Sequence, residues 1–132
     1  MGWNPNHLHL IIKAQQVRQL TTVRMTREFL SDIIDAAGMT CIRGPHAENV
    51  EEKDNYGPTG VAILSTSHCS VHSWPNRKLM QADLYSCCEF EVDAILEVFR
   101  QFGNGTLEYM LVDRNNDLEV KYQSIKMIHG EP

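Results

Sequence analysis

Apolar side chains alternate with polar ones in several short stretches of the chain, a pattern typical of β-strands with one buried face. In the first stretch, residues 7–14, three apolar residues alternate with His7, His9 and Ile11. This pattern predicts a strand, and we place it at an edge of the sheet with its histidines on the outer face. Further strands are predicted at residues 40–44, 61–64, 69–74, 79–86, 106–113 and 118–128.

Two other stretches repeat their apolar residues at helical spacing. Residues 26–39 and 90–102 each carry one apolar stripe, and Gly38 and Gly103 supply natural stops for the two helices. Residues 45–58 are polar and broken by Asn, Asp, Gly and Pro, which predicts a long loop. The order of elements predicts an α+β fold, a two-layer sandwich in which an antiparallel sheet carries both helices on one face.

Composition narrows the range of partners. At 132 residues the chain is expected to form a single domain, 1–132, too small for a deep cleft of its own. A site shared between two subunits is therefore expected.

The net charge of −5 and the absence of a Lys/Arg run argue against nucleic acid or an anionic membrane as a partner, and suit a small cationic metabolite. With no apolar run of roughly 20 residues and no signal-peptide core, the protein is expected in the cytoplasm, with reduced cysteines.

The densest chemistry lies in residues 65–75, which combine hydroxyls, a thiol and two imidazoles. Val, Thr and Trp favour an extended conformation here, and Pro75 ends it. On a strand, His68 and His72 share a face but lie roughly 13 Å apart, too far for one zinc ion. His7 and His9 form another possible ligand pair, without an evident third ligand. We therefore expect no metal.

The middle third of the chain resembles the bacterial and archaeal S-adenosylmethionine decarboxylases. The resemblance rests on Gly57-Pro58-Thr59-Gly60-Val61, on the run from Thr66 to Asn76 (TSHCSVHSWPN), and on Asp83-Leu84-Tyr85-Ser86-Cys87. These segments match, without gaps, the family pattern of Gly-x-x-Gly-Val, then Glu-Ser-His-x-Ser-x-His-Thr-Trp-Pro-Glu, then Asp-x-x-x-Cys. The resemblance implies a fold of the same two-layer kind, assembled as a homodimer in which two protomers complete each site.

A decarboxylase needs an electron sink, and no side chain is a good one. The lysines fall in polar settings unsuited to a Schiff base, which leaves a carbonyl made from the backbone. The resemblance implies that Ser67 attacks the carbonyl of Thr66, that the chain splits, and that Ser67 becomes a pyruvoyl group. It assigns proton transfer during cleavage to His72 and an assisting hydroxyl to Thr59. The products would be a β chain of residues 1–66 and an α chain of residues 67–132.

Cys87 stands where the family keeps its catalytic cysteine, the proton donor to the substrate carbon. A thiol suits that role because its ordinary pKa of about 8.5 leaves it mostly protonated at neutral pH yet easily ionised. Its neighbour Cys88 is expected to point to the opposite face of the strand and pack there.

The chain departs from the family pattern at two positions. Thr66 and Asn76 replace glutamates, and the second of these glutamates holds the ribose of S-adenosylmethionine in relatives, beside the position of Trp74. An amide offers one acceptor oxygen and no charge, so the nucleoside would be held less well. Three hypotheses remain open: decarboxylation of S-adenosylmethionine for spermidine synthesis, decarboxylation of arginine or ornithine by the same chemistry, and an uncleaved homologue that binds or regulates.

Overall fold

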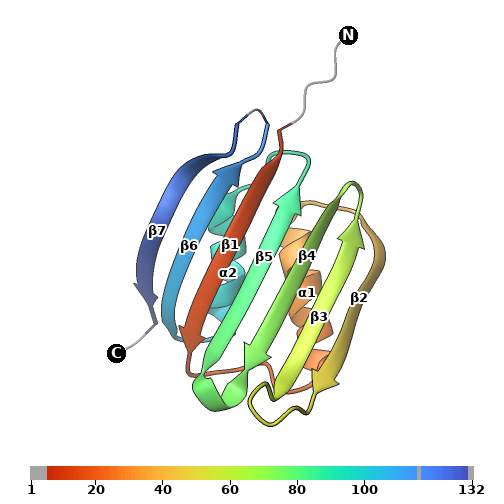
Figure 1. Ribbon diagram of the computed structural model, residues 1–132, viewed down its shortest axis with the longest axis vertical. Coiled ribbons are helices and arrows are strands. Elements are labelled where there is room, and N and C mark those ends of the chain that lie inside the picture. The colour runs from red at the N-terminus through yellow and green to blue at the C-terminus, as the bar shows by residue number, and fades with distance from the viewer. Residues whose placement is uncertain (1–5, 116, 131–132) are drawn as a thin grey trace.

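A computed structural model describes residues 6–115 and 117–130, and confirms the predicted two-layer α+β architecture (Figure 1). One seven-stranded antiparallel sheet has the order β2-β3-β4-β5-β1-β6-β7, and both helices cover the same face of it. The strands are β1 (Leu8–Gln16), β2 (Cys41–Val50), β3 (Gly57–Leu64), β4 (Ser67–Trp74), β5 (Leu79–Ser86), β6 (Gly105–Asp113) and β7 (Glu119–His129); the helices are α1 (Val23–Ala37) and α2 (Val92–Phe102).

The first strand lies in the middle of the sheet, and its predicted position at an edge is wrong. β1 pairs with β5 on one side and with β6 on the other. The alternation of apolar and polar residues shows which face is covered, but it does not show how many neighbours a strand has. The two edges are formed instead by β2 and β7.

The second strand is longer than predicted, because it continues through Pro45 to Val50 where a loop was expected. The pairing of β2 with β3 shifts register between Cys41 and Arg43 and again between Arg43 and His46. Such bulges on an edge strand accommodate a proline, which cannot donate to a neighbouring strand. The loop is thereby shortened to residues 51–56.

Each helix buries one apolar stripe against the sheet. α1 begins at Thr22, whose side chain accepts a hydrogen bond from the backbone of Met25, and ends at Gly38, whose φ of 68° suits glycine. The rings of Phe29 on α1 and Phe99 on α2 meet edge to face at 5.0 Å between centroids. Together with alternate residues of the central strands, these rings form the hydrophobic core.

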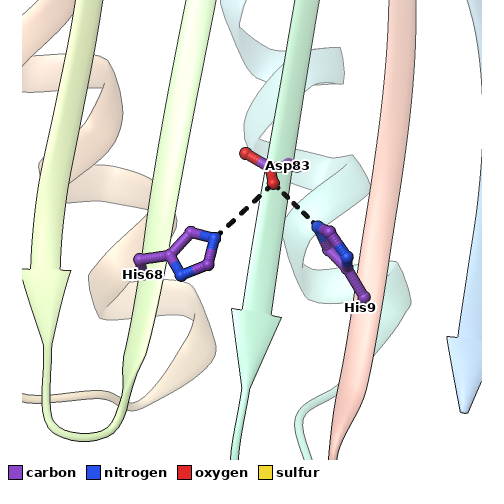
Figure 2. A group of neighbouring side chains, drawn as sticks. All are labelled: His9, His68 and Asp83. Carbon is purple, nitrogen blue, oxygen red and sulfur yellow. Dashed lines mark hydrogen bonds and ion pairs between the residues drawn. The ribbon is translucent and has the colours of Figure 1, made fainter. Parts of the chain in front are cut away.

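In the part of the chain that the structure describes, no helix covers the other face of the sheet (Figure 1). Alternate residues of the central strands project from this open face, among them His9, His68 and Asp83 (Figure 2). His9 Nε2 lies 2.7 Å from Asp83 Oδ2. Burial opposes ionisation of Asp83, but hydrogen bonds from His9 and Ser70 outweigh it and lower the pKa of this carboxyl.

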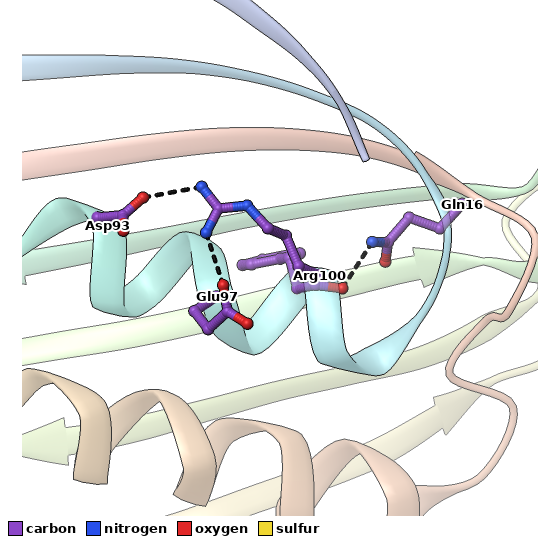
Figure 3. Close-up of polar contacts among 5 residues, drawn as sticks. Gln16, Asp93, Glu97 and Arg100 are labelled. Carbon is purple, nitrogen blue, oxygen red and sulfur yellow. Dashed lines mark hydrogen bonds and ion pairs between the residues drawn. The ribbon is translucent and has the colours of Figure 1, made fainter. Parts of the chain in front are cut away.

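The C-terminal end of α2 is fixed to the sheet by Gln16, the last residue of β1 (Figure 3). The Gln16 side-chain amide is buried and donates to the carbonyls of Phe99 and Gly103, at 2.9 and 3.2 Å. The Phe99 carbonyl also accepts from the backbone N–H of Gly103, at 3.2 Å, so the Gln16 amide is a second donor to it and ties the end of α2 to β1. On the outer side of α2, Arg100 pairs with Asp93 and Glu97.

Candidate active site

The turn between β3 and β4 consists of Ser65 and Thr66, and Thr66 has a φ of 49°. This is the left-handed region, which strains a β-branched residue by on the order of 1–2 kcal/mol or more. Ser67 follows directly as the first residue of β4. The predicted cleavage bond, Thr66–Ser67, therefore lies in a tight and strained hairpin turn.

Cys87, just beyond the end of β5, is in contact with both residues of that bond. Its backbone N–H donates to Ser67 Oγ at 3.1 Å, and its Sγ lies 2.6 Å from Thr66 Oγ1. The Cys87 thiol also points to the carbonyl oxygen of Ser65, at 3.7 Å. Thr66, Ser67 and Cys87, which were predicted to act together, thus form one cluster, hereafter the Ser67 cluster.

The Ser67 cluster changes the acidity of its thiol. Hydrogen bonds with Thr66 and, to a lesser extent, with Ser67 lower the pKa of Cys87, because they stabilise the thiolate. The contact with the Thr66 hydroxyl was not foreseen from the sequence, since the two residues are 21 positions apart. Only the register that brings the β3–β4 turn beside the end of β5 reveals it.

The role of Thr66 can be measured from the pH dependence of Cys87 alkylation in a Ser67→Ala chain, which keeps the turn intact. Adding Thr66→Val removes the hydroxyl, so the pKa of Cys87 should rise and the half-maximal alkylation rate should move to higher pH. Thr66→Ser should leave the midpoint unchanged. The rates are followed by mass spectrometry of the Cys87 peptide.

Cys69 serves as an internal reference in the same experiment. It is 1% exposed, and burial raises its pKa to about 12, so it should stay unmodified throughout. If the alkylation midpoint were the same in the Ser67→Ala chain and in the same chain with Thr66→Val, the Thr66 hydroxyl would not act on the Cys87 thiol.

Thr59 and His72 form a second cluster, hereafter the His72 cluster. Thr59 Oγ1 lies 3.1 Å from His72 Nδ1, and the two residues are direct partners across β3 and β4. His72 is five residues after Ser67 and projects from the open face, whereas Ser67 is buried on the helix-covered face. Five strand residues span about 16 Å, so the two clusters do not meet within one chain.

Trp74 and Asn76 lie at the same end of β4 as His72. The rings of Trp74 and His72 are 6.1 Å apart between centroids, and Trp74 Nε1 donates to Asn55 Oδ1 at 3.3 Å. Asn76 is in the single 3₁₀ turn that follows, Pro75–Arg77. A small cavity of about 140 Å³ here is lined by Lys53, Asp54, Tyr56, Trp74, Asn76 and Arg77.

One prediction about the cysteines is wrong. Cys88 does not pack on the far side of a strand, because β5 has already ended at Ser86 and Cys88 is exposed. Its neighbour Cys87 is half-buried in the Ser67 cluster. Within residues 6–115 and 117–130, neither helix is long and apolar enough to cross a membrane.

Comparisons with known proteins agree on one family. A sequence profile described as S-adenosylmethionine decarboxylase matches residues 8–115. The S-adenosylmethionine decarboxylase proenzymes of Archaeoglobus fulgidus and Thermomicrobium roseum are 22% and 29% identical to this chain; each match covers 80% of this chain, and 95% and 90% of the relatives. A crystal structure of the adenosylmethionine decarboxylase of Aquifex aeolicus superposes with a TM-score of 0.71 at 22% identity, covering 92% of this chain and all of that one.

Proposed function

Because the chain belongs to the S-adenosylmethionine decarboxylase family, a family of carboxy-lyases, we propose that it cleaves its own Thr66–Ser67 bond and then decarboxylates S-adenosylmethionine. The match confirms the family and the enzyme class predicted from the sequence. Decarboxylated S-adenosylmethionine would serve spermidine synthesis. The cleavage bond, the residue roles and the assembly described next are our proposals.

The strained turn at Thr66 is the observation that carries the proposal. Attack of Ser67 Oγ on the Thr66 carbonyl carbon converts the amide to an ester and releases the strained peptide geometry. Loss of the Ser67 α-proton then breaks the bond from Cβ to the ester oxygen, leaving a carboxylate on Thr66. The new terminal residue, a dehydroalanine, tautomerises to an imine, and water hydrolyses this imine to the pyruvoyl ketone with release of ammonia.

In the mature protein, the pyruvoyl group supplies a ketone that condenses with the substrate amine and accepts the electrons left by carbon dioxide. Cys87 is placed beside this position by its backbone hydrogen bond to Ser67 Oγ. Its thiol would hold the proton that the substrate carbon takes up. A lowered pKa makes that proton easier to transfer near neutral pH.

The separation of the two clusters supports a homodimer. His72 cannot reach Ser67 on its own chain, as about 16 Å of strand lies between them. The open face has exposed apolar residues, including Ile11, Val61 and Ile63, that are suited to burial against a second copy. Two open faces packed with their β4 strands in opposite directions would bring the His72 cluster of each protomer over the end of the partner's β4 that begins at Ser67, where the β3–β4 turn gives a route to the Ser67 cluster.

The substrate pocket would then draw on the end of β4 that carries Trp74 and Asn76. The indole offers a flat surface for the adenine ring, and the Asn76 amide offers one oxygen and two N–H donors to the ribose hydroxyls. Asp54 lines the same small cavity and supplies negative charge for a sulfonium. Arginine and ornithine lack the nucleoside that this end of the strand would hold.

Two measurements test the proposed function. Intact mass spectrometry of the purified protein should find fragments that break between Thr66 and Ser67, the second of which is blocked at its N-terminus. Carbon dioxide should then be released from carboxyl-labelled S-adenosylmethionine at least tenfold faster than from arginine or ornithine. An uncleaved chain would overturn the maturation step, and a preference for arginine or ornithine would overturn the choice of substrate.

A further inference from the structure

We propose that His9, His68 and Asp83 on the open face form a binding site for a divalent transition metal of the zinc type. This site is separate from the residues to which we assign cleavage and decarboxylation. The three side chains converge from β1, β4 and β5 (Figure 2). One ligand nitrogen from each histidine and one Asp83 oxygen lie within 4.8 Å of one another.

The register of three neighbouring strands produces the convergence. His9 and His68 both lie directly opposite Tyr85 on β5, one from each side. Asp83 is two residues away on β5 and therefore projects from the same face between them. The sequence hides this arrangement because the three residues are far apart along the chain. The register of the strands also gives His9 two further ligands, His68 and Asp83, whereas the sequence pattern offered it only His7.

The spacing is close to what a metal requires. The Asp83 Oδ2 atom is 2.7 Å from His9 Nε2 and 3.8 Å from His68 Nε2. Tetrahedral zinc with bonds of about 2.0–2.1 Å needs its ligand atoms about 3.4 Å apart. Side-chain rotations would have to open the first of these pairs by about 0.7 Å and close the second by about 0.4 Å. They would also have to bring the two histidine nitrogens, which lie within 4.8 Å of each other, toward about 3.4 Å, and the metal would replace the hydrogen bond between His9 and Asp83.

The surroundings hold the ligands in place and leave room for the ion. The hydroxyl of Ser70 donates to Asp83 Oδ1, which orients the carboxylate and leaves Oδ2 for the metal. The Tyr85 ring stacks on His68 at 5.6 Å and meets His9 edge to face at 6.0 Å. Within one chain the His68 side chain is 52% exposed, which leaves space beside its imidazole for an ion.

The ligand set selects the kind of metal. Two imidazoles and one carboxylate suit zinc and neighbouring transition metals, whereas magnesium prefers oxygen ligands alone. Three protein ligands leave a fourth position for water or for another donor. On a face that we expect to pack against a second protomer, that position would be available to a group from the partner.

Zinc titration of the metal-free full chain, by calorimetry or by competition with a chelating dye, tests the site. We expect one zinc ion per chain and no binding of magnesium. His9→Gln and His68→Gln should each weaken zinc binding by more than the roughly 10- to 100-fold expected for loss of an outer partner of a ligand. Each variant is checked by circular dichroism, and two independent variants guard against misfolding in one.

His46→Gln is the matched control. It removes an exposed histidine that has one carboxylate neighbour, Glu48 at 3.0 Å, and zinc affinity should not change. Cobalt loading separates this site from the free thiols, since thiolate ligands give charge-transfer absorption and imidazole with carboxylate does not. Absence of stoichiometric zinc binding, unchanged affinity in both glutamine variants, or thiolate absorption would each overturn the proposal, whether or not the chain cleaves itself.

Discussion

Ser67→Ala is expected to leave the protein as one uncleaved polypeptide that releases no carbon dioxide from S-adenosylmethionine. Alanine has no oxygen with which to attack the Thr66 carbonyl, so neither the ester nor the pyruvoyl group can form. The variant should still fold, because it loses one hydrogen bond, from the backbone N–H of Cys87, worth about 1 kcal/mol. Intact mass and carbon dioxide release measure both outcomes.

Ser65→Ala is the matched control for this experiment. Ser65 is a second serine of the β3–β4 turn region, and its side chain is exposed. Its contribution to the Ser67 cluster comes from its backbone carbonyl, which alanine retains. Its cleavage and activity should equal those of the unchanged chain. Full cleavage of the Ser67→Ala chain at the same bond would contradict the proposed origin of the carbonyl.

The layers of this fold could be predicted from the sequence, but the order of its strands could not. Alternation and helical spacing report burial, and burial is what places both helices on one face. The neighbours of each strand depend on long-range pairing, and for that reason β1 was placed at an edge instead of the centre. The predicted strand at residues 40–44 ended too early, before Pro45, because the bulges of β2 cannot be inferred from local composition.

The candidate site, like the fold, could be predicted from the sequence only in part. The spacing of Ser67, His72 and Cys87 identified the family from the sequence, and the comparisons confirm that family. The odd separation of Ser67 and His72 is enough to put them on opposite faces of an extended β4, as the structure has them. The contact of Thr66 with Cys87 could not be predicted in this way, because it depends on the register that brings the β3–β4 turn beside the end of β5.

Cys87→Ser should cleave itself and then decarboxylate poorly. Serine keeps the size and the hydrogen-bonding capacity of cysteine, so the turn at Thr66 should persist. Its hydroxyl is a far weaker acid than a thiol whose pKa is already lowered, and the proton needed by the substrate carbon would arrive slowly. We expect kcat per mole of pyruvoyl group to fall by about 10²–10⁴, the usual contribution of a positioned acid.

Expressing the rate per mole of pyruvoyl group, counted with a carbonyl reagent, separates the proton transfer from any slower cleavage. Cys88→Ser is the matched control: it alters the adjacent, exposed thiol and should keep kcat within about twofold. If Cys87→Ser kept its kcat, or if Cys88→Ser lost as much, the proton would have to come from another group. His72 would then be the next to test, because a homodimer of the proposed arrangement places it nearest to the Ser67 cluster.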